Sequence, residues 1–193
     1  MLDIDFSKFV QPYRGYHVSG DCAVVKGVAD GLFLGIVDVL GHGPEAHDLA
    51  APIEDFLDEH GSNQPALLLN KLDGFLRGSR GAAAGLAFLE AASGNLQYAG
   101  IGNTVIRKFG NSEIRLVSRD GIVGQNMRTP RLERMTLSRG DVLVMYSDGV
   151  RDHFALRDYP QLLSDTACTI TAQVVRRFGK GHDDACCIAV RYR

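Results

Sequence analysis

Aspartates next to apolar runs are the residues of this sequence best suited to chemistry. They are Asp21, Asp38, Asp148 and the adjacent pair Asp183 and Asp184. A carboxylate at the end of a buried strand is costly to desolvate unless a cation compensates it. Several such carboxylates that converge repel one another unless a metal ion occupies the space between them. Their residue type and placement therefore predict a binding site for divalent cations.

The donor type narrows the choice of metal. Oxygen ligands favour Mg²⁺ or Mn²⁺, because hard cations prefer carboxylate, carbonyl and water oxygens. Asp38 and Asp148 each have a glycine within three residues, and glycine allows the backbone to approach an ion or a phosphate closely. Any one of these aspartates is equally well explained as the cap of a turn. The complete set, together with the motifs described below, favours a metal centre.

Two other motifs suggest different chemistry. His42 and His47 are five residues apart with a Gly-Pro pair between them, so they would not share a helix face as the histidines of a zinc protease do. Gly41-His42-Gly43 is compatible with a dinucleotide-binding loop, for which Asp55 or Asp58 would bind the ribose. The strand pattern that follows argues against this fold, because it lacks alternating strands and helices.

The elements that must position these side chains follow from periodicity and turn residues. Predicted strands cover residues 16–28, 32–39, 82–91, 96–101, 105–109, 114–117, 134–137, 142–147 and 185–192. Pro44 opens a predicted helix over residues 45–59, and Pro65 opens a second one. Further helical material is expected between residues 150 and 178. This order predicts an α+β fold in which two mostly antiparallel sheets pack together with helices outside.

Composition excludes several classes of protein. The 193 residues are 45% hydrophobic and contain no linker or repeat, so we expect one domain over residues 1–193. A net charge of -2 gives no general attraction for nucleic acid or an anionic membrane. No apolar stretch approaches the roughly 18 residues of a membrane span. No heptad pattern indicates an oligomer, so we expect a monomer.

The cysteines and the first residues bear on the compartment. Cys22, Cys168, Cys186 and Cys187 form no C-x-x-C pair, which argues against a zinc cage or a disulfide framework. We expect them to be buried free thiols, which are typical of a reducing compartment. The first residues carry acids in place of the basic and apolar segments of a signal peptide. We therefore expect a cytoplasmic protein.

Four motifs surround the aspartates and occur in a fixed order along the chain. They are Ser19-Gly20-Asp21, Asp38-Val39-Leu40-Gly41-His42-Gly43, Ser147-Asp148-Gly149-Val150 and Asp183-Asp184-Ala185-Cys186. Supporting matches are Arg80-Gly81-Ala82, Gly100-Ile101-Gly102-Asn103 and Leu137-Ser138-Arg139-Gly140-Asp141. The ordered set resembles the PPM family of metal-dependent protein phosphatases, in particular its bacterial SpoIIE branch. The resemblance extends over nearly the whole chain, from about residue 16 to residue 192.

This resemblance implies an αββα sandwich with a centre of two Mn²⁺ or Mg²⁺ ions between the sheets. By analogy, Asp38 bridges the two ions and the backbone carbonyl of Val39 contacts one of them. Asp148 and Asp183 complete the site of one ion, and Asp21 serves the other. The ions of such a centre lower the pKa of a bridging water for in-line attack on the phosphoryl group, so no phosphoenzyme is expected.

The resemblance also implies a substrate class. It predicts hydrolysis of phosphoserine or phosphothreonine on a regulatory protein. The short chain is most similar to the stressosome-associated phosphatases of the branch, whose substrates would be stressosome scaffold proteins or STAS-domain regulators. Two alternatives stay open: a binding module that keeps the fold without turnover, and a phosphohydrolase acting on small molecules.

Three positions depart from the family pattern. Val39 stands where glycine is frequent, and Cys186 stands where threonine is usual. Leu40 occupies the position at which some members have a histidine proposed as general acid. His42 lies two residues further on, and either reaches the leaving group or faces solvent where the helix begins.

Overall fold

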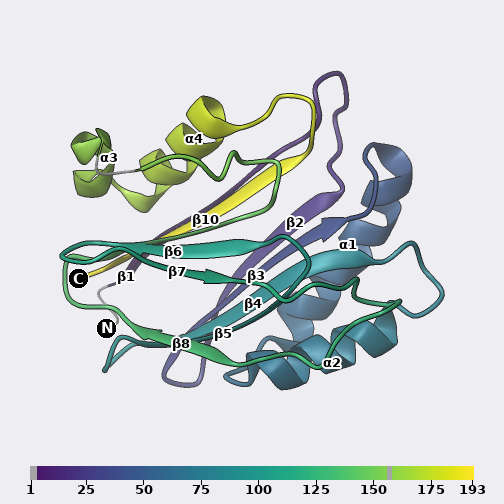
Figure 1. The fold of residues 1–193 in the computed structure, drawn as a ribbon, viewed down its shortest axis with the longest axis horizontal. Helices are drawn as coiled ribbons and strands as arrows, with labels where there is room; N and C mark the ends of the chain where they lie inside the picture. The colour runs from purple at the N-terminus through teal and green to yellow at the C-terminus, as the bar shows by residue number, and fades with distance from the viewer. Residues whose placement is uncertain (1–3, 156–157) are drawn as a thin grey trace.

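Two five-stranded antiparallel sheets form the centre of the molecule in the computed structural model, which describes residues 4–155 and 158–193 (Figure 1). The first sheet has the order β2 (Asp21–Val28), β3 (Gly31–Val39), β4 (Ala82–Glu90), β5 (Asn95–Ile101) and β8 (Glu133–Thr136). The second has the order β1 (Ile4–Gln11), β10 (Ala185–Tyr192), β9 (Val142–Tyr146), β6 (Val105–Phe109) and β7 (Ile114–Val117).

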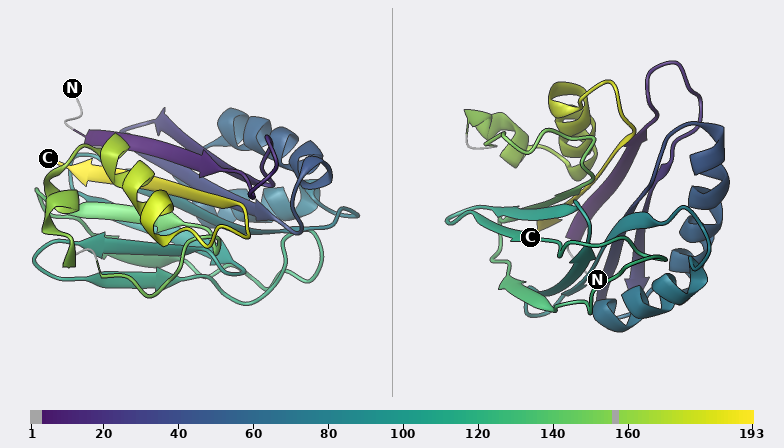
Figure 2. Two further views of the ribbon diagram at one scale, coloured as in Figure 1. Left: turned by 90° about the horizontal axis from the view of Figure 1, so that it is seen from above. Right: turned by 45° about the vertical axis from the view of Figure 1, so that its right-hand side comes forward.

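Helices cover the outer face of each sheet, so the layers follow the order αββα (Figures 1 and 2). Helices α1 (Pro44–His60) and α2 (Pro65–Phe75) pack on the first sheet, and both begin with the proline that the sequence predicts. Helices α3 (Pro160–Ser164) and α4 (Ala167–Phe178) lie on the side of the second sheet. Thr166 caps α4, because its side chain accepts a hydrogen bond from the Thr169 amide. The predicted α+β sandwich is confirmed.

Strand β3 shows how the sequence specifies these layers. Its run of apolar residues is buried on both faces, as the unbroken hydrophobic pattern predicts. Phe33 and Val37 pack in the core beneath α1 and α2, whereas Leu34 and Ile36 pack between the sheets. Because side chains alternate along a strand, the even-numbered Asp38 has its side chain on the face toward the second sheet.

The same alternation orients the second sheet. In β9, Val144 and Tyr146 pack against α4, whereas Leu143 and Met145 fill the space between the sheets. In β10, Cys186 lies between the sheets and Cys187 lies beneath α4, so the two adjacent cysteines point to opposite faces, as alternation along a strand requires. The odd-numbered residues of β9 and the even-numbered residues of β10 therefore face the first sheet.

Some predicted boundaries are wrong. The strand predicted over residues 16–28 begins only at Asp21, since residues 12–20 form a loop. The helical material expected between residues 150 and 178 is present, as α3 begins at Pro160 and α4 ends at Phe178. Strand β1 has no counterpart among the predicted elements, because it is an edge strand whose residues are mostly half-buried or exposed.

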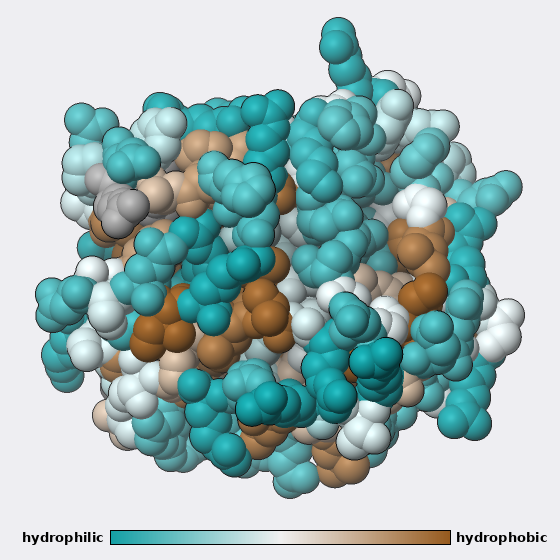
Figure 3. Space-filling model, viewed as in Figure 1, coloured by the Kyte–Doolittle hydropathy of each residue, from teal (hydrophilic) through white to brown (hydrophobic). Residues whose placement is uncertain are grey.

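The surface and the cysteines add two findings. Hydrophilic residues predominate on the face shown in Figure 3, and apolar residues appear there in separate patches. Cys22, Cys186 and Cys187 are buried free thiols, but Cys168 is exposed, contrary to the prediction for all four. Cys168 lies near the start of α4, which has one face turned to solvent.

Among the described residues, no helix is both long and apolar enough to cross a membrane.

Candidate active site

Two aspartates of the first sheet lie side by side where β2 begins and β3 ends. Asp21 and Asp38 are directly opposite each other in the antiparallel pairing of these strands. The register places both side chains on the face toward the second sheet, since residues directly opposite each other share a face. Like charges in this arrangement repel each other, so the pairing is unfavourable while both carboxyls are ionised.

The second sheet contributes Asp148 after β9 and Asp183 with Asp184 before β10. The two strands pair so that Tyr146 lies opposite Cys187, which brings the ends carrying these aspartates together. The turn after Asp148 requires glycine, because a Cβ at Gly149 would overlap the backbone carbonyl of Asp184. Pairing of β9 with β10 thus fixes the positions of the aspartates on this side.

Ser147 connects the two sheets at the site. Its hydroxyl donates a hydrogen bond to Oδ2 of Asp21 at 2.6 Å and accepts one from the Cys186 amide at 3.0 Å. Ser147 and Asp21 are both buried, so this bond holds one carboxylate oxygen of the first sheet against the second sheet.

Asp183 and Asp184 are adjacent in sequence but differ in their contacts. Asp184 is 3% exposed, and its two carboxylate oxygens accept hydrogen bonds from the amides of Tyr13 at 2.7 Å and Gly20 at 2.9 Å. It therefore anchors the loop of residues 12–20 to β10. Asp183 is partly exposed, and burial followed by the nearby charge of Asp148 raises its pKa. These contacts give Asp184 a structural role and leave Asp183 facing Asp148.

The carboxyls of the first sheet are strongly perturbed. Burial, followed by the charges of Asp21 and Asp148, raises the pKa of Asp38 to about 9. Burial also raises the pKa of Asp21 to about 7, against the hydrogen bond from Ser147, which lowers it. Both pKa values are raised for the same reason, because several carboxylates lie close together where little water can hydrate their charge.

The residues fit a divalent cation by donor type and by charge. Asp21, Asp38, Asp148 and Asp183 supply only hard oxygen donors, which suit Mg²⁺ or Mn²⁺. A cation between them would relieve the repulsion that the raised pKa values express. Within residues 4–155 and 158–193, no three acidic, histidine or cysteine side chains form a ready-made ligand cluster. One carboxylate oxygen of Asp148 already has partners within the chain.

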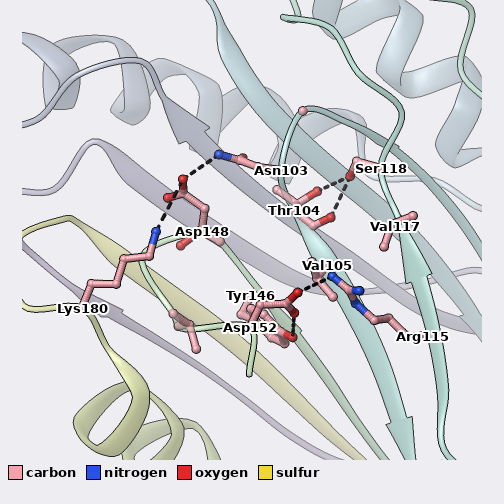
Figure 4. Close-up of a pocket in the computed structure, with 13 residues that line it drawn as sticks. Asn103, Thr104, Val105, Arg115, Val117, Ser118, Tyr146, Asp148, Asp152 and Lys180 are labelled. Carbon is pink, nitrogen blue, oxygen red and sulfur yellow. Dashed lines mark hydrogen bonds and ion pairs between the residues drawn. The ribbon is translucent and has the colours of Figure 1, made fainter. Parts of the chain in front are cut away.

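Asp148 has two partners that the sequence did not single out for it. Its Oδ2 accepts a hydrogen bond from Nδ2 of Asn103 at 2.8 Å and lies 3.8 Å from Nζ of Lys180 (Figure 4). Asn103 was recognised only within the Gly100-Ile101-Gly102-Asn103 motif. Lys180 lies just before the Asp183 motif, and nothing in its local sequence marked it as part of the site.

A cavity of about 310 Å³ opens beside Asp148. Its polar walls include Lys180 on one side and Arg115 on the other (Figure 4). Arg115 pairs with Asp152, which also accepts a hydrogen bond from the Tyr146 hydroxyl at 2.9 Å. The cavity wall therefore carries negative charge from Asp148 and Asp152 and positive charge from Arg115 and Lys180.

The turn between β3 and α1 carries the other predicted residues. Val39 is buried and its amide donates to the Gly20 carbonyl at 3.1 Å. Gly41 has a φ of 100°, and a Cβ there would lie 2.7 Å from a guanidinium nitrogen of Arg80. His42 is exposed, and its ring stacks on that of Tyr13 with centroids 4.7 Å apart. It lies at the rim of the site, where the loop of residues 12–20 meets α1.

Comparison with known proteins identifies similar sequences and folds. Residues 29–193 match the family model of stage II sporulation protein E (SpoIIE). No curated protein matches the chain.

Solved structures share the fold over nearly the full chain. One of these structures comes from a study of the bacterial stressosome, described as a modular system that has been adapted to control secondary messenger signalling. It is 26% identical, with a TM-score of 0.88, and the match covers 98% of this chain and 100% of that one. RsbX in complex with magnesium is 16% identical with a TM-score of 0.83, over 98% and 96% of the two chains. The SiaA PP2C domain of Pseudomonas aeruginosa is 22% identical with a TM-score of 0.75, over 97% and 86%.

Proposed function

The chain belongs to the SpoIIE family of PP2C-type phosphatase domains, and we propose on that basis that it is a metal-dependent protein serine/threonine phosphatase. One observation carries the proposal. Aspartates lie at the ends of the paired strands β2 and β3 and of the paired strands β9 and β10, and Ser147 bonds Asp21 across the two sheets at this point. The raised pKa values there indicate charge that a divalent cation would neutralise.

The proposed ligands divide between the sheets. Asp38 would be shared by two ions, with the Val39 backbone carbonyl on one of them. Asp148 and Asp183 would complete one site, and Asp21 would serve the other. Asp184 is left out of the ligand set, because both of its oxygens already accept backbone amides. When bound, Mn²⁺ or Mg²⁺ would activate water and stabilise the charge that develops on the phosphoryl oxygens.

The residues of the chain have separate tasks in this proposal. The Ser147 hydroxyl orients Asp21 by holding one of its oxygens. Asn103 holds one oxygen of Asp148. The cavity beside Asp148 admits the phosphorylated side chain, since it opens directly onto that carboxylate.

His42 is the proposed proton donor to the leaving group. Its exposed ring and its position in the turn after β3 support access from solvent. A serine leaving group requires protonation, whereas an aryl phosphate has a more acidic leaving group and requires it less. His42→Gln is therefore expected to slow phosphopeptide hydrolysis while aryl phosphate hydrolysis is retained. Equal rates for His42→Gln and the unmodified protein on both substrates would remove His42 from the mechanism.

The substrate is proposed to be a phosphorylated regulatory protein. The match to a chain from work on the bacterial stressosome, which extends over the whole of that chain, supports a stressosome scaffold protein or a STAS-domain regulator as the partner. RsbX has the same fold at 16% identity, and that similarity supports the fold without favouring RsbX over other members.

Phosphate release tests the proposal and separates it from its alternatives. The substrates are an aryl phosphate and a phosphoserine peptide, each with Mn²⁺, Mg²⁺ or EDTA. We expect metal-dependent turnover of both that Asp148→Asn abolishes, whereas Asp55→Asn, on the exposed face of α1, retains it. Turnover of small phosphate esters alone would favour a small-molecule phosphohydrolase. No turnover with any metal or substrate would favour a binding module.

A further inference from the structure

Lys180 is a cation held at the edge of the acidic cluster. Its Nζ lies 3.8 Å from Oδ2 of Asp148, and the two side chains are 31% and 37% exposed. Its charge also lowers the pKa of Asp183, against the larger effect of burial. Lys180 is therefore close to two of the proposed metal ligands, Asp148 and Asp183. Among the described residues, its side chain forms no hydrogen bond that stabilises the fold.

The backbone fixes where this lysine lies. The Lys180 amide donates to the Gly149 carbonyl at 2.8 Å, and the Arg151 amide donates to the Phe178 carbonyl at 2.8 Å. Gly179 and Val150 form an antiparallel bridge between these two bonds. The end of α4 is therefore joined to the turn after Asp148, so the Lys180 side chain begins from a fixed point beside that carboxylate.

Lys180 and Asp148 line the same cavity (Figure 4). Arg115, the other cation of this cavity, forms an ion pair with Asp152. The distance of 3.8 Å between Lys180 and Asp148 is too long for a hydrogen bond. Lys180 is therefore the more weakly held of the two cations and can exchange its partner at little cost.

A phosphate ester that enters the cavity meets negative charge from the aspartates. Metal ions bound by Asp148 and Asp183 would take up that charge and compete with Lys180 for Asp148. The released ammonium has three donors and no acceptor, and lysine binds phosphate as a point charge. Phosphoryl oxygens that enter the cavity beside Asp148 would offer this ammonium an acceptor.

We propose that Lys180 binds the phosphoryl oxygens of the substrate, a dianionic phosphate monoester, in the cavity beside Asp148. This role rests on the proposed phosphatase function. The competing explanation is that Lys180 only balances the charge of Asp148. The two differ in what they predict for phosphate affinity.

Binding of inorganic phosphate to the Mn²⁺-loaded protein, measured by calorimetry, tests this role without requiring turnover. Lys180→Met is expected to weaken phosphate binding about tenfold, the value of one charge-assisted contact. Lys180→Arg is expected to keep the affinity within about threefold, because it retains the positive charge. The matched control is Lys71→Met, which removes an exposed lysine of α2.

A second titration, with Mn²⁺ alone, separates the two explanations. Under the proposal, Lys180→Met binds Mn²⁺ at least as tightly as the unmodified protein while its phosphate affinity falls and its KM for aryl phosphate rises about tenfold. Tighter Mn²⁺ binding with unchanged phosphate affinity would overturn it and leave Lys180 as a counter-ion. If the unmodified protein binds phosphate but hydrolyses no substrate, the phosphatase function fails while the role of Lys180 is still decided by the titration.

Discussion

The two halves of the site differ in how they hold their carboxylates. On the first sheet, Asp21 and Asp38 face each other from paired strands in poorly hydrated surroundings, and their pKa values are raised. On the second sheet, Asp148 is half exposed and already has Asn103 and Lys180 as partners. Under the proposed function, the buried first half would hold the cation, whereas the half-exposed second half would be reached by solvent and by the substrate. Burial alone therefore distinguishes the two groups of aspartates, although their side chains are chemically identical.

The largest expected effect comes from removing the buried charge of the first half. Asp38→Asn is expected to reduce phosphate release about a thousandfold, or roughly 4 kcal/mol of transition-state stabilisation. Initial rates on an aryl phosphate across a range of Mn²⁺ concentrations measure this loss. Asp55→Asn serves as the control, and full activity of Asp38→Asn at saturating Mn²⁺ would show that this carboxylate is not a ligand.

The next prediction compares two adjacent residues of the second half. Asp184→Ala is expected to destabilise the fold by about 2–4 kcal/mol, because it leaves the buried amides of Tyr13 and Gly20 without their acceptor. Asp183→Ala is expected to leave stability within about 1 kcal/mol while activity falls about a hundredfold. Urea unfolding and initial rates provide the two measurements. The reverse pattern would exchange the roles of the two aspartates.

The pH dependence of the metal-free protein sharpens the comparison further. Asp38 has a folded pKa of about 9 against an ordinary aspartate pKa of 3.8, so the folded state keeps a proton that the unfolded chain releases. The stability of EDTA-treated protein should therefore be greatest below pH 4 for this group and fall as pH rises toward about 9. Urea unfolding between pH 5 and pH 9 measures the slope.

Asp38→Asn provides the control for that slope. It removes the titrating group and one charge beside Asp21, so the loss of stability with rising pH should become smaller. An unchanged slope in the variant would mean that the perturbed charge lies elsewhere.

The smallest expected effect concerns the partner of Asp148. Asn103→Ala removes one hydrogen bond to the half-exposed carboxylate of Asp148. We expect the rate of phosphate release to fall about fivefold. Because Asp148 is partly hydrated, water replaces the lost donor and stability should be nearly unchanged. Initial rates and thermal unfolding measure both quantities. A loss as large as that of Asp38→Asn would contradict the distinction between the two halves.

Features set by local pattern could be predicted from the sequence. The apolar run over residues 32–39 predicted strand β3, and Pro44 and Pro65 marked the first turns of α1 and α2. The close turns after residue 81 predicted antiparallel strands, which the sheets contain. These features depend on short-range spacing, which the sequence displays directly.

Features set by tertiary contacts could not be predicted. Sequence alone did not distinguish Asp183 from Asp184, since the distinction depends on amides more than 160 residues away in the chain. Lys180 reaches Asp148 only because the end of α4 pairs with the turn after β9. Strand β1 was missed because an edge strand with little burial lacks a clear hydrophobic alternation.

We propose that carboxylates from both sheets form one metal centre, and calorimetric titration with Mn²⁺ tests this directly. The unmodified protein, Asp38→Asn, Asp148→Asn and Asp55→Asn are titrated side by side. We expect saturable binding for the unmodified protein and for Asp55→Asn, with severe loss of affinity in both Asp38→Asn and Asp148→Asn. Binding of Mn²⁺ by Asp38→Asn and Asp148→Asn with unchanged affinity would contradict this proposal.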